Sequence, residues 1–342
     1  LRSACKALGF TGMVEVALFA DILTLKEALE FERHVREPGD FQLTSCCCPV
    51  WIAMIRKRYH ELLPHVPGAV SPMVACGRFL KRIHPDAVTI FAGPCLAKKK
   101  EAKEPDIVPE NIPLDILYED QDIIMINKPK QMVVHPAPGH YSGTLVNALM
   151  YHCLDNLSGI NGVLRPGIVH RIDMNTTGVL VACKNDYSHN FIAEQLSVHS
   201  ITRKYYAIVL NGFNTEEGTI DAPIGRNPSD RKKMAIDKKN GKRAVTHYKV
   251  LEQFGRYSYI ECQLETGRTH QIRVHMASIG HPLLGDDVYG SGRSPFKLTG
   301  QTLHAGVLGF IHPTSKEYVE YSAPLPEYFK MILDKLRKQV II

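Results

Sequence analysis

Hydrophobic and polar positions follow different patterns in the two parts of the chain, and this difference predicts where the chain divides. In the first part, apolar residues recur at helical spacing over residues 23–36 and 51–63, and a short apolar run at 87–91 predicts a buried strand. Residues 98–105 are mostly charged, end in proline and show no hydrophobic periodicity, which is typical of a linker. We therefore expect two regions, residues 1–104 and residues 105–342.

The second region contains more strand patterns than helix patterns. Apolar runs and alternation predict strands at 114–118, 123–126, 168–171, 178–183, 204–210, 244–251, 257–264 and 318–322. Helical spacing predicts helices at 144–152, 189–199, 271–279 and 326–338. Because the strands outnumber the helices and do not alternate regularly with them, we expect an α+β fold with a largely antiparallel sheet.

The composition is that of an ordinary globular protein. The 342 residues are 44% hydrophobic and 22% charged, which excludes a disordered, collagen-like or coiled-coil chain. No apolar run approaches the ~18 residues that a membrane span needs, and the first residues carry no secretory pattern. We therefore expect a cytoplasmic protein with no membrane partner.

The net charge of +6 is unevenly distributed along the second region. Residues 104–122 contain seven acidic residues and no basic one, whereas residues 226–243 contain eight basic residues against two acidic ones. We call residues 226–243 the basic strip. Such a strip can hold a polyanion along one face, although a solvated surface loop would have the same composition.

One short segment, residues 165–178, places an acid beside basic groups. The expected strand at 168–171 carries apolar residues, His170 and Arg171 lie at its end, and Asp173 follows under a turn that closes at Gly178. A lone aspartate at such a place more often forms an Asx turn than a functional site.

Two further segments favour the functional interpretation. Residues 266–275 bring together five donor-bearing side chains, which suit a polyanionic ligand or a buried carboxylate better than a bare surface. They are Arg268, His270, Gln271, Arg273 and His275. Residues 201–207 place two tyrosines just inside an expected strand, where a ring could stack on a flat substrate, although a tyrosine in a strand usually belongs to the core.

Together with the motifs at 127–136, 143–148 and 280–290, these segments resemble the pseudouridine synthases of the large ribosomal-RNA and tRNA type, over about residues 109–337. The resemblance implies the catalytic fold of that family and an isomerase that converts uridine to pseudouridine in structured RNA, with large-subunit ribosomal RNA as the first candidate. It also implies that Asp173 is the catalytic aspartate, that Tyr205 stacks on the target base and that Arg268 is the basic partner of the aspartate.

RNA is the partner that this resemblance implies, and no obligatory protein partner is evident. We expect four basic side chains to contact the RNA: Arg171, Lys232, Lys233 and Arg273. The family usually has a lysine and an aspartate directly after the catalytic aspartate, where this chain has Met174 and Asn175. This departure leaves a non-catalytic RNA-binding protein as an alternative.

The isomerisation needs neither a metal nor a cofactor, because no electrons are exchanged and no group is imported. The bond between N1 and C1′ must break, the uracil must turn, and C5 must join C1′. One carboxylate suffices for this, either by attacking C1′ or by removing a proton from the ribose. The sequence does not separate these two routes.

The first region resembles part of the large subunit of an iron-only hydrogenase, through residues 43–51, 71–73 and 93–99. This resemblance implies a partial α/β region and, in that family, cysteine ligands of an iron–sulfur cluster. Cys95 matches one ligand, and Cys47 or Cys48 matches another, depending on the alignment. The family's last two ligands lie in a segment that is absent here, so we expect a remnant without a functional cluster; an iron–sulfur redox protein is the alternative.

Overall fold

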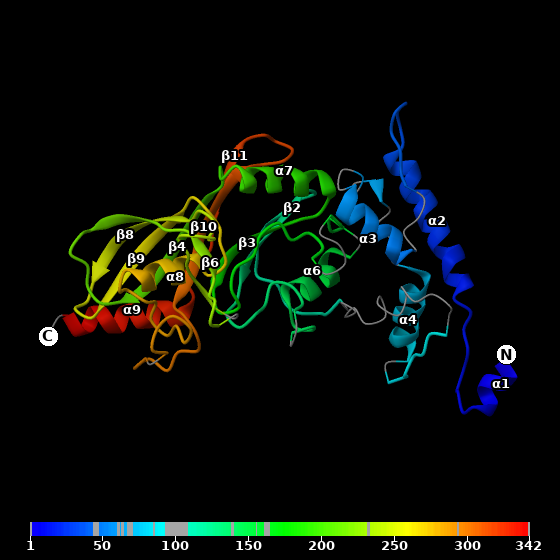
Figure 1. Cartoon of the computed structure of the whole chain (residues 1–342), viewed down its shortest axis with the longest axis horizontal. Coiled ribbons are helices and arrows are strands. Elements are labelled where there is room, and N and C mark those ends of the chain that lie inside the picture. The colour runs from blue at the N-terminus through cyan, green and yellow to red at the C-terminus, as the bar shows by residue number, and fades with distance from the viewer. Residues whose placement is uncertain are drawn as a thin grey trace. The chain divides into compact units, whose positions relative to one another are not determined.

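The chain forms two units in this computed structural model, Leu1–Asp106 and Ile107–Ile342 (Figure 1). The residues described are 2–43, 48–59, 62, 65–66, 71–84, 86–92, 109–137, 140–154, 156–160, 165–230, 233–292 and 294–340. The boundary that the sequence predicts, after residue 104, lies close to the boundary between these units. None of the helices in the described ranges is long and apolar enough to cross a membrane.

The described part of the first unit is helical. Its helices are α1 (Arg2–Ala7), α2 (Ala17–His34), α3 (Pro49–Arg58) and α4 (Pro72–Ile83). Phe19 and Leu23 of α2 are buried and α2 packs on α4, where the ring centroids of Phe19 and Phe79 lie 5.6 Å apart. The side chain of Ser71 caps α4 by accepting the N–H of Val74.

The strand expected at 87–91 is wrong. Residues 86–92 form no regular structure, and Val88 and Ile90 are 87% and 68% exposed. A short apolar run forms a strand only when a neighbouring strand pairs with it, and no strand element occurs among the described residues of this unit. The α/β architecture expected for this region is therefore not seen in its described part.

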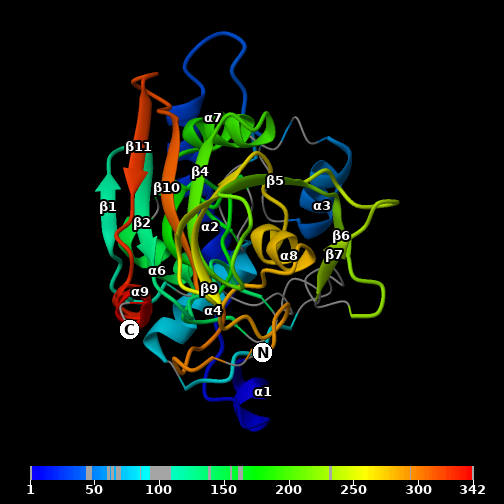
Figure 2. The ribbon, with the colours of Figure 1, turned by 90° about the vertical axis from the view of Figure 1, so that its left-hand side faces the viewer.

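A nine-stranded sheet forms the body of the second unit (Figure 1). Its order is β1 (Ile116–Glu119), β2 (Ile123–Lys128), β3 (Thr177–Cys183), β10 (Leu303–Ile311), β4 (Thr202–Leu210), β9 (Tyr257–Leu264), β8 (Val245–Gln253) and β5 (Glu217–Asp221). The ninth strand, β11 (Tyr318–Ser322), pairs with the second half of β10 (Figure 2). Neighbouring strands are antiparallel except β3 and β10, which are parallel, so the expected α+β fold with a largely antiparallel sheet is confirmed.

Helices cover both faces of this sheet. Ile272 of α8 (Gln271–Ser278) packs with Val209 of β4, whereas Phe329 of α9 (Glu327–Val340) packs with Ile208, the neighbouring residue of the same strand. Since successive side chains of a strand point to opposite faces, α8 and α9 lie on opposite sides of β4. The half of the sheet around β2 and β3 packs against α6 (Leu145–Cys153) and α7 (Asp186–Ser197).

The strand expected at 168–171 is also wrong. Only Ile168 forms a bridge, to Ala182, and the chain runs on as a loop. A side chain replaces a backbone hydrogen bond here: Nε2 of His170 accepts the N–H of Val181 at 3.2 Å. The loop therefore passes along β3 without forming a ladder, and it carries Asp173 to the start of β3.

The sequence analysis missed the central strand β10, because glycines interrupt its pattern. A side chain at Gly306 would lie 2.4 Å from the ring of Tyr206, and one at Gly309 would lie 2.1 Å from the hydroxyl of Tyr318. Glycine in a strand interior often marks such a close approach of a neighbour. These two glycines leave room for tyrosine rings that pack across the strand.

One row of directly paired residues crosses the sheet. It passes from β2 to β5 through Lys128, Gly178, Ala305, Tyr205, Cys262, Tyr248 and Gly218. Gly178 has φ +111°, and a Cβ there would lie 2.1 Å from the carbonyl oxygen of Ala305. Glycine at this position allows β3 and β10 to meet.

We expect Gly178→Ala to destabilise the second unit by several kcal/mol, because the added Cβ forces β3 away from β10. Gly255→Ala is the matched control: Gly255 also has a positive φ, +64°, but a Cβ there meets nothing within 4 Å. The control variant should therefore lose only about 1–2 kcal/mol from backbone strain. Urea unfolding of both variants measures the difference, and equal losses would contradict the close approach.

Candidate active site

Asp173 lies in the turn that leads into β3, and three contacts hold this turn. The N–H of Thr176 donates to the carbonyl oxygen of Asp173 at 3.0 Å, and Gln301 donates to the Thr176 hydroxyl at 3.1 Å. The ammonium group of Lys128 donates to the carbonyl oxygen of Met174 at 3.1 Å. The backbone from Asp173 to Thr176 is therefore held in place in the free protein.

Lys128 is a fully buried side chain that the sequence analysis noted only as part of a motif. Its Nζ also donates to the carbonyl oxygens of Pro129 and Met132, both at 2.8 Å, so all three of its protons are used. Burial lowers the pKa of Lys128 to about 7, and the charge of Asp173 opposes this shift. The apolar run of β2 directly before this lysine was the available signal that it would be buried.

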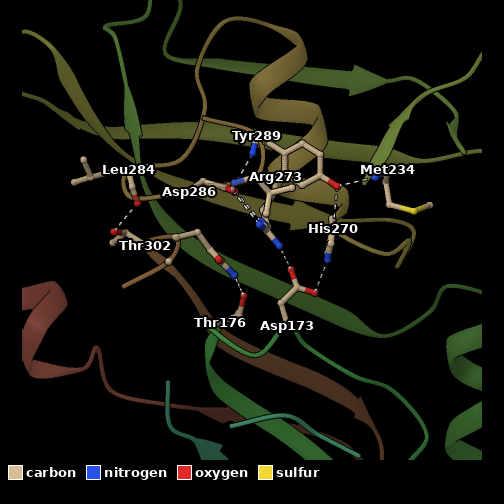
Figure 3. Close-up of polar contacts among 12 residues, drawn as sticks. Asp173, Thr176, Met234, His270, Arg273, Leu284, Asp286, Tyr289 and Thr302 are labelled. Atoms are coloured by element: carbon tan, nitrogen blue, oxygen red, sulfur yellow. Dashed lines mark hydrogen bonds and ion pairs between the residues drawn. The ribbon is translucent and has the colours of Figure 1, made fainter. Parts of the chain in front are cut away.

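A buried guanidinium joins Asp173 to a second carboxylate (Figure 3). One terminal nitrogen of Arg273 donates to Oδ2 of Asp173 at 3.0 Å. The Nε and the other terminal nitrogen donate to the two oxygens of Asp286, at 2.7 and 3.0 Å. The side chains of Arg273 and Asp286 are 6% and 0% exposed, whereas that of Asp173 is 21% exposed. Asp173 is thus the carboxylate of this network that faces the open side.

The two buried partners of this network stabilise each other's charge. Burial alone would lower the pKa of Arg273, but the hydrogen bonds and charge of Asp286, together with Asp173, outweigh burial and raise it. Burial alone would raise the pKa of Asp286, but Arg273 and the N–H groups of Tyr289 and Val288 lower it. The guanidinium is therefore a permanent cation beside Asp173.

These contacts correct two predictions. Arg268 was expected to be the basic partner of Asp173, but its Nε donates to the carbonyl oxygen of Arg243 at 2.9 Å, and Arg273 makes the ion pair instead. Arg273 was expected to bind RNA, but it is buried and both its edges are occupied by carboxylates. The two arginines share one short motif. Arg273 lies on α8 and is held by Asp286, and it is the one that reaches the aspartate.

A pocket brings together most of the side chains singled out in the sequence. Asp173, Tyr205 and Arg268 line it, with Arg171 and His270. Tyr205 of β4 packs against the hydrophobic clusters on both sides of the site, and burial raises the pKa of its hydroxyl. Arg171 is exposed, and its guanidinium lies 3.3 Å from Nε2 of His135.

The remaining polar residues of the 266–275 motif are structural. Gln271 donates to the carbonyl oxygen of Val245 at 2.9 Å, which attaches the start of α8 to β8. The two ring nitrogens of His275 contact the Thr246 hydroxyl and the carbonyl oxygen of Ala222, each at 2.9 Å. Of the two interpretations of this donor-rich motif, the buried carboxylate fits better than a polyanion bound directly.

The basic strip begins in a hairpin outside the main sheet, built from β6 (Ile224–Arg226) and β7 (Met234–Ile236), and continues beyond β7. Lys238 and Lys239 are exposed and Lys233 is partly exposed, whereas Lys232 lies outside the described residues. Of the predicted cluster ligands, Cys47 and Cys95 also lie outside the described residues, and Cys48 is a partly exposed free thiol.

Comparison with known proteins agrees with this fold. A family model described as RNA pseudouridylate synthase matches residues 122–278. An uncharacterized RNA pseudouridine synthase of Bacillus subtilis is 58% identical over 233 residues, which are 68% of this chain and 76% of that protein. The ribosomal large subunit pseudouridine synthase D of Zymomonas mobilis is 51% identical over 236 residues, 67% of this chain and 74% of that protein.

A solved structure shows the same likeness. The human RNA pseudouridylate synthase domain containing 1 superposes with a TM-score of 0.51 at 26% identity, over 66% of this chain and 95% of that one. The chain belongs to the RNA pseudouridine synthase family, and it is therefore an isomerase that acts on RNA.

A second family model, described as the C-terminal domain of the iron only hydrogenase large subunit, matches residues 1–126. This match covers less than half of the chain, and its last residues belong to β2 of the second unit. The resemblance of residues 1–104 to a hydrogenase fragment therefore stays a prediction.

We expect Asp286→Asn to destabilise the second unit by about 3–5 kcal/mol at pH 7, because it removes one partner of a buried ion pair. Asp287→Asn, on the exposed neighbouring carboxylate, should change stability by about 0.5 kcal/mol or less. The lowered pKa of Asp286 means that its contribution is present above the ordinary carboxyl pKa and is lost as the pH falls below about 4. Urea unfolding from pH 7 to 3 should show the gap between the two variants narrowing below about pH 4, by at most about 1.4 kcal/mol per pH unit. A gap as large at pH 3 as at pH 7 would contradict this assignment.

Proposed function

We propose that this chain isomerises uridine in large-subunit ribosomal RNA and that Asp173 is its catalytic carboxylate. One observation carries the assignment of the residue: Asp173 presents one oxygen to Arg273 and the other to a pocket lined by Tyr205. A carboxylate that is fixed on a permanent cation and still accessible is suited to act as a nucleophile or a base.

The reaction balances without any added group. The bond from N1 to C1′ breaks, the bond from C5 to C1′ forms, C5 loses a proton and N1 gains one. Asp173 attacks C1′ and is later displaced by C5, or it takes a proton from the ribose and returns it. Both routes need a carboxylate oxygen with an available lone pair, and a site that retains the detached uracil.

Other pocket residues supply the binding. We assign to Tyr205 the role of stacking on the target base, since its ring lines the pocket beside Asp173. Arg171 and Arg268 line the same pocket without holding the carboxylate in the described contacts, so we assign both to the RNA. The target nucleotide must leave its stack to reach Asp173, as in other enzymes that act on a base.

The departures at Met174 and Asn175 leave this arrangement in place. Met174 contributes its carbonyl oxygen to Lys128, which any residue could supply. The side chain of Asn175 lies against Gly300, where a Cβ would be 2.2 Å from the Asn175 amide nitrogen. Neither residue disturbs the pair of Asp173 and Arg273, so catalysis is favoured over RNA binding alone.

The substrate rests on similarity and charge. Relatives named ribosomal large subunit pseudouridine synthase D include the Zymomonas mobilis protein and one of Neisseria meningitidis that is 47% identical over 240 residues, 67% of this chain and 63% of that protein. The basic strip offers exposed lysines to a structured RNA. We also propose that the activity resides in the second unit, which contains every residue of the pocket.

Asp173→Asn should abolish pseudouridine formation while the protein still folds and binds RNA, because the substitution keeps the shape and removes the nucleophilic or basic oxygen. Tritium release from [5-3H]uridine-labelled RNA measures turnover, since the isomerisation expels the proton at C5. The RNA comes from cells that lack this chain, and a map of its pseudouridines with and without added enzyme identifies the target. The control variant Asp334→Asn on α9 should keep wild-type turnover. Wild-type turnover by Asp173→Asn would show that Asp173 is not the catalytic carboxylate.

Replacing Lys233, Lys238 and Lys239 by glutamine should weaken binding to all RNA sequences and flatten its salt dependence. Each lost phosphate contact should reduce the slope of log K against log salt by about 0.7–0.9. Replacing the exposed Lys335 and Lys338 of α9 is the matched control. Filter binding between about 50 and 200 mM salt measures both slopes. An unchanged slope in the triple variant would make the basic strip an ordinary solvated loop.

A further inference from the structure

His270 contacts the side of Asp173 that Arg273 leaves open (Figure 3). Its Nε2 lies 3.7 Å from Oδ1 of Asp173, whereas Arg273 holds Oδ2. His270 is the residue before α8 and has φ +57°, a left-handed backbone that histidine adopts more readily than most side chains. The backbone therefore aims this ring at the aspartate.

The contacts of Tyr289 favour one tautomer of His270. The hydroxyl of Tyr289 accepts the backbone N–H of Met234 at 2.8 Å, and it lies 2.8 Å from Nδ1 of His270 (Figure 3). Because this oxygen already accepts the N–H of Met234, we assign the Tyr289 proton to the bond with Nδ1. A neutral imidazole that accepts at Nδ1 carries its proton on Nε2. The N–H of His270 therefore faces Oδ1 of Asp173.

The ring remains neutral in this position. Burial lowers the pKa of His270, and the nearby cations Arg273 and Arg171 lower it further, while the carboxylates Asp173 and Asp286 oppose the shift. A neutral ring with a fixed tautomer is a directional donor, and it adds no charge that would compete with Arg273 for the aspartate.

We propose that His270 is a positioning residue of the isomerisation, which donates its Nε2 proton to Oδ1 of Asp173 and is set in that tautomer by Tyr289. The proposal rests on the function proposed above, with Asp173 as the catalytic carboxylate. Arg273 and His270 then each occupy one lone pair of a different oxygen, which fixes the orientation of the carboxylate and leaves Oδ1 a second lone pair for the substrate. The distance of 3.7 Å is too long for a hydrogen bond in the free protein, and such catalytic contacts often shorten when substrate binds.

Two substitutions of His270 separate this role from a purely structural one. His270→Gln keeps a donor near the place of Nε2, whereas His270→Asn keeps a donor only near the place of Nδ1. Asparagine tolerates a left-handed backbone better than glutamine, so the asparagine variant should be the more stable of the two.

We expect His270→Asn to lower kcat by about 10- to 100-fold, the loss typical of a hydrogen bond to a charged group, with KM unchanged. His270→Gln should recover most of this loss despite its lower stability. Tritium release from [5-3H]uridine-labelled RNA of cells lacking this chain measures both constants, and thermal unfolding of the full chain measures stability. If the asparagine variant is more active than the glutamine variant, residue 270 matters only for the left-handed backbone conformation, and the proposal is wrong.

Tyr289→Phe supplies a test that leaves His270 in place. Without the hydroxyl, neutral His270 loses the bond to Nδ1, so its pKa should rise and protonation should begin at a higher pH. The acid limb of kcat should therefore move to higher pH, where the wild-type profile is still flat. An unchanged profile and unchanged kcat would overturn the role of Tyr289.

The outcomes also separate this proposal from the one on which it rests. No tritium release by the wild-type protein, or full release by Asp173→Asn, contradicts the proposed function. A wild-type protein that is active, an inactive Asp173→Asn and a fully active His270→Asn contradict only the role of His270.

Discussion

The buried guanidinium of Arg273 is the interaction on which the site depends. It is almost inaccessible to water and lies between two carboxylates, of which Asp286 is fully buried and Asp173 faces the pocket. A charge at this depth is tolerated only because Asp286 and the N–H groups that hold Asp286 compensate it. The same pair leaves one guanidinium nitrogen for Asp173. The same guanidinium therefore forms the buried ion pair and orients the proposed catalytic carboxylate.

The site lies at the centre of the sheet. Lys128, Gly178 and Tyr205 lie in one row of paired residues, on three different strands. β10 pairs with β3 over its first residues and with β11 over its later ones, so the sheet branches at the level of Gly178. The loop with Asp173 enters β3 at this branch, where α8 brings Arg273 and His270 from the other half of the sheet. The pocket thus joins groups separated by 100 residues in the sequence.

Buried polar groups orient the site. Burial lowers the pKa values of both Lys128 and His270. Backbone carbonyl oxygens orient the ammonium group of Lys128, and the ring of His270 lies beside the carboxylate of Asp173. Tyr289 connects His270 to the backbone of Met234, the first residue of β7 in the basic strip. A continuous line of contacts therefore leads from the proposed RNA-binding hairpin to the proposed catalytic carboxylate.

The sequence by itself determined the antiparallel sheet, most of its strands, and the segments that carry Asp173, Tyr205 and the 266–275 motif, because alternation and turn residues are local signals. It did not reveal β10, whose glycines are explained only by the tyrosine rings packed over them. It assigned to Arg268 the ion pair that Arg273 makes. Both arginines suit a carboxylate equally by chemistry, and the choice between them follows from the direction of α8 and the position of Asp286. Those are properties of packing between distant segments, so only the tertiary structure decided them.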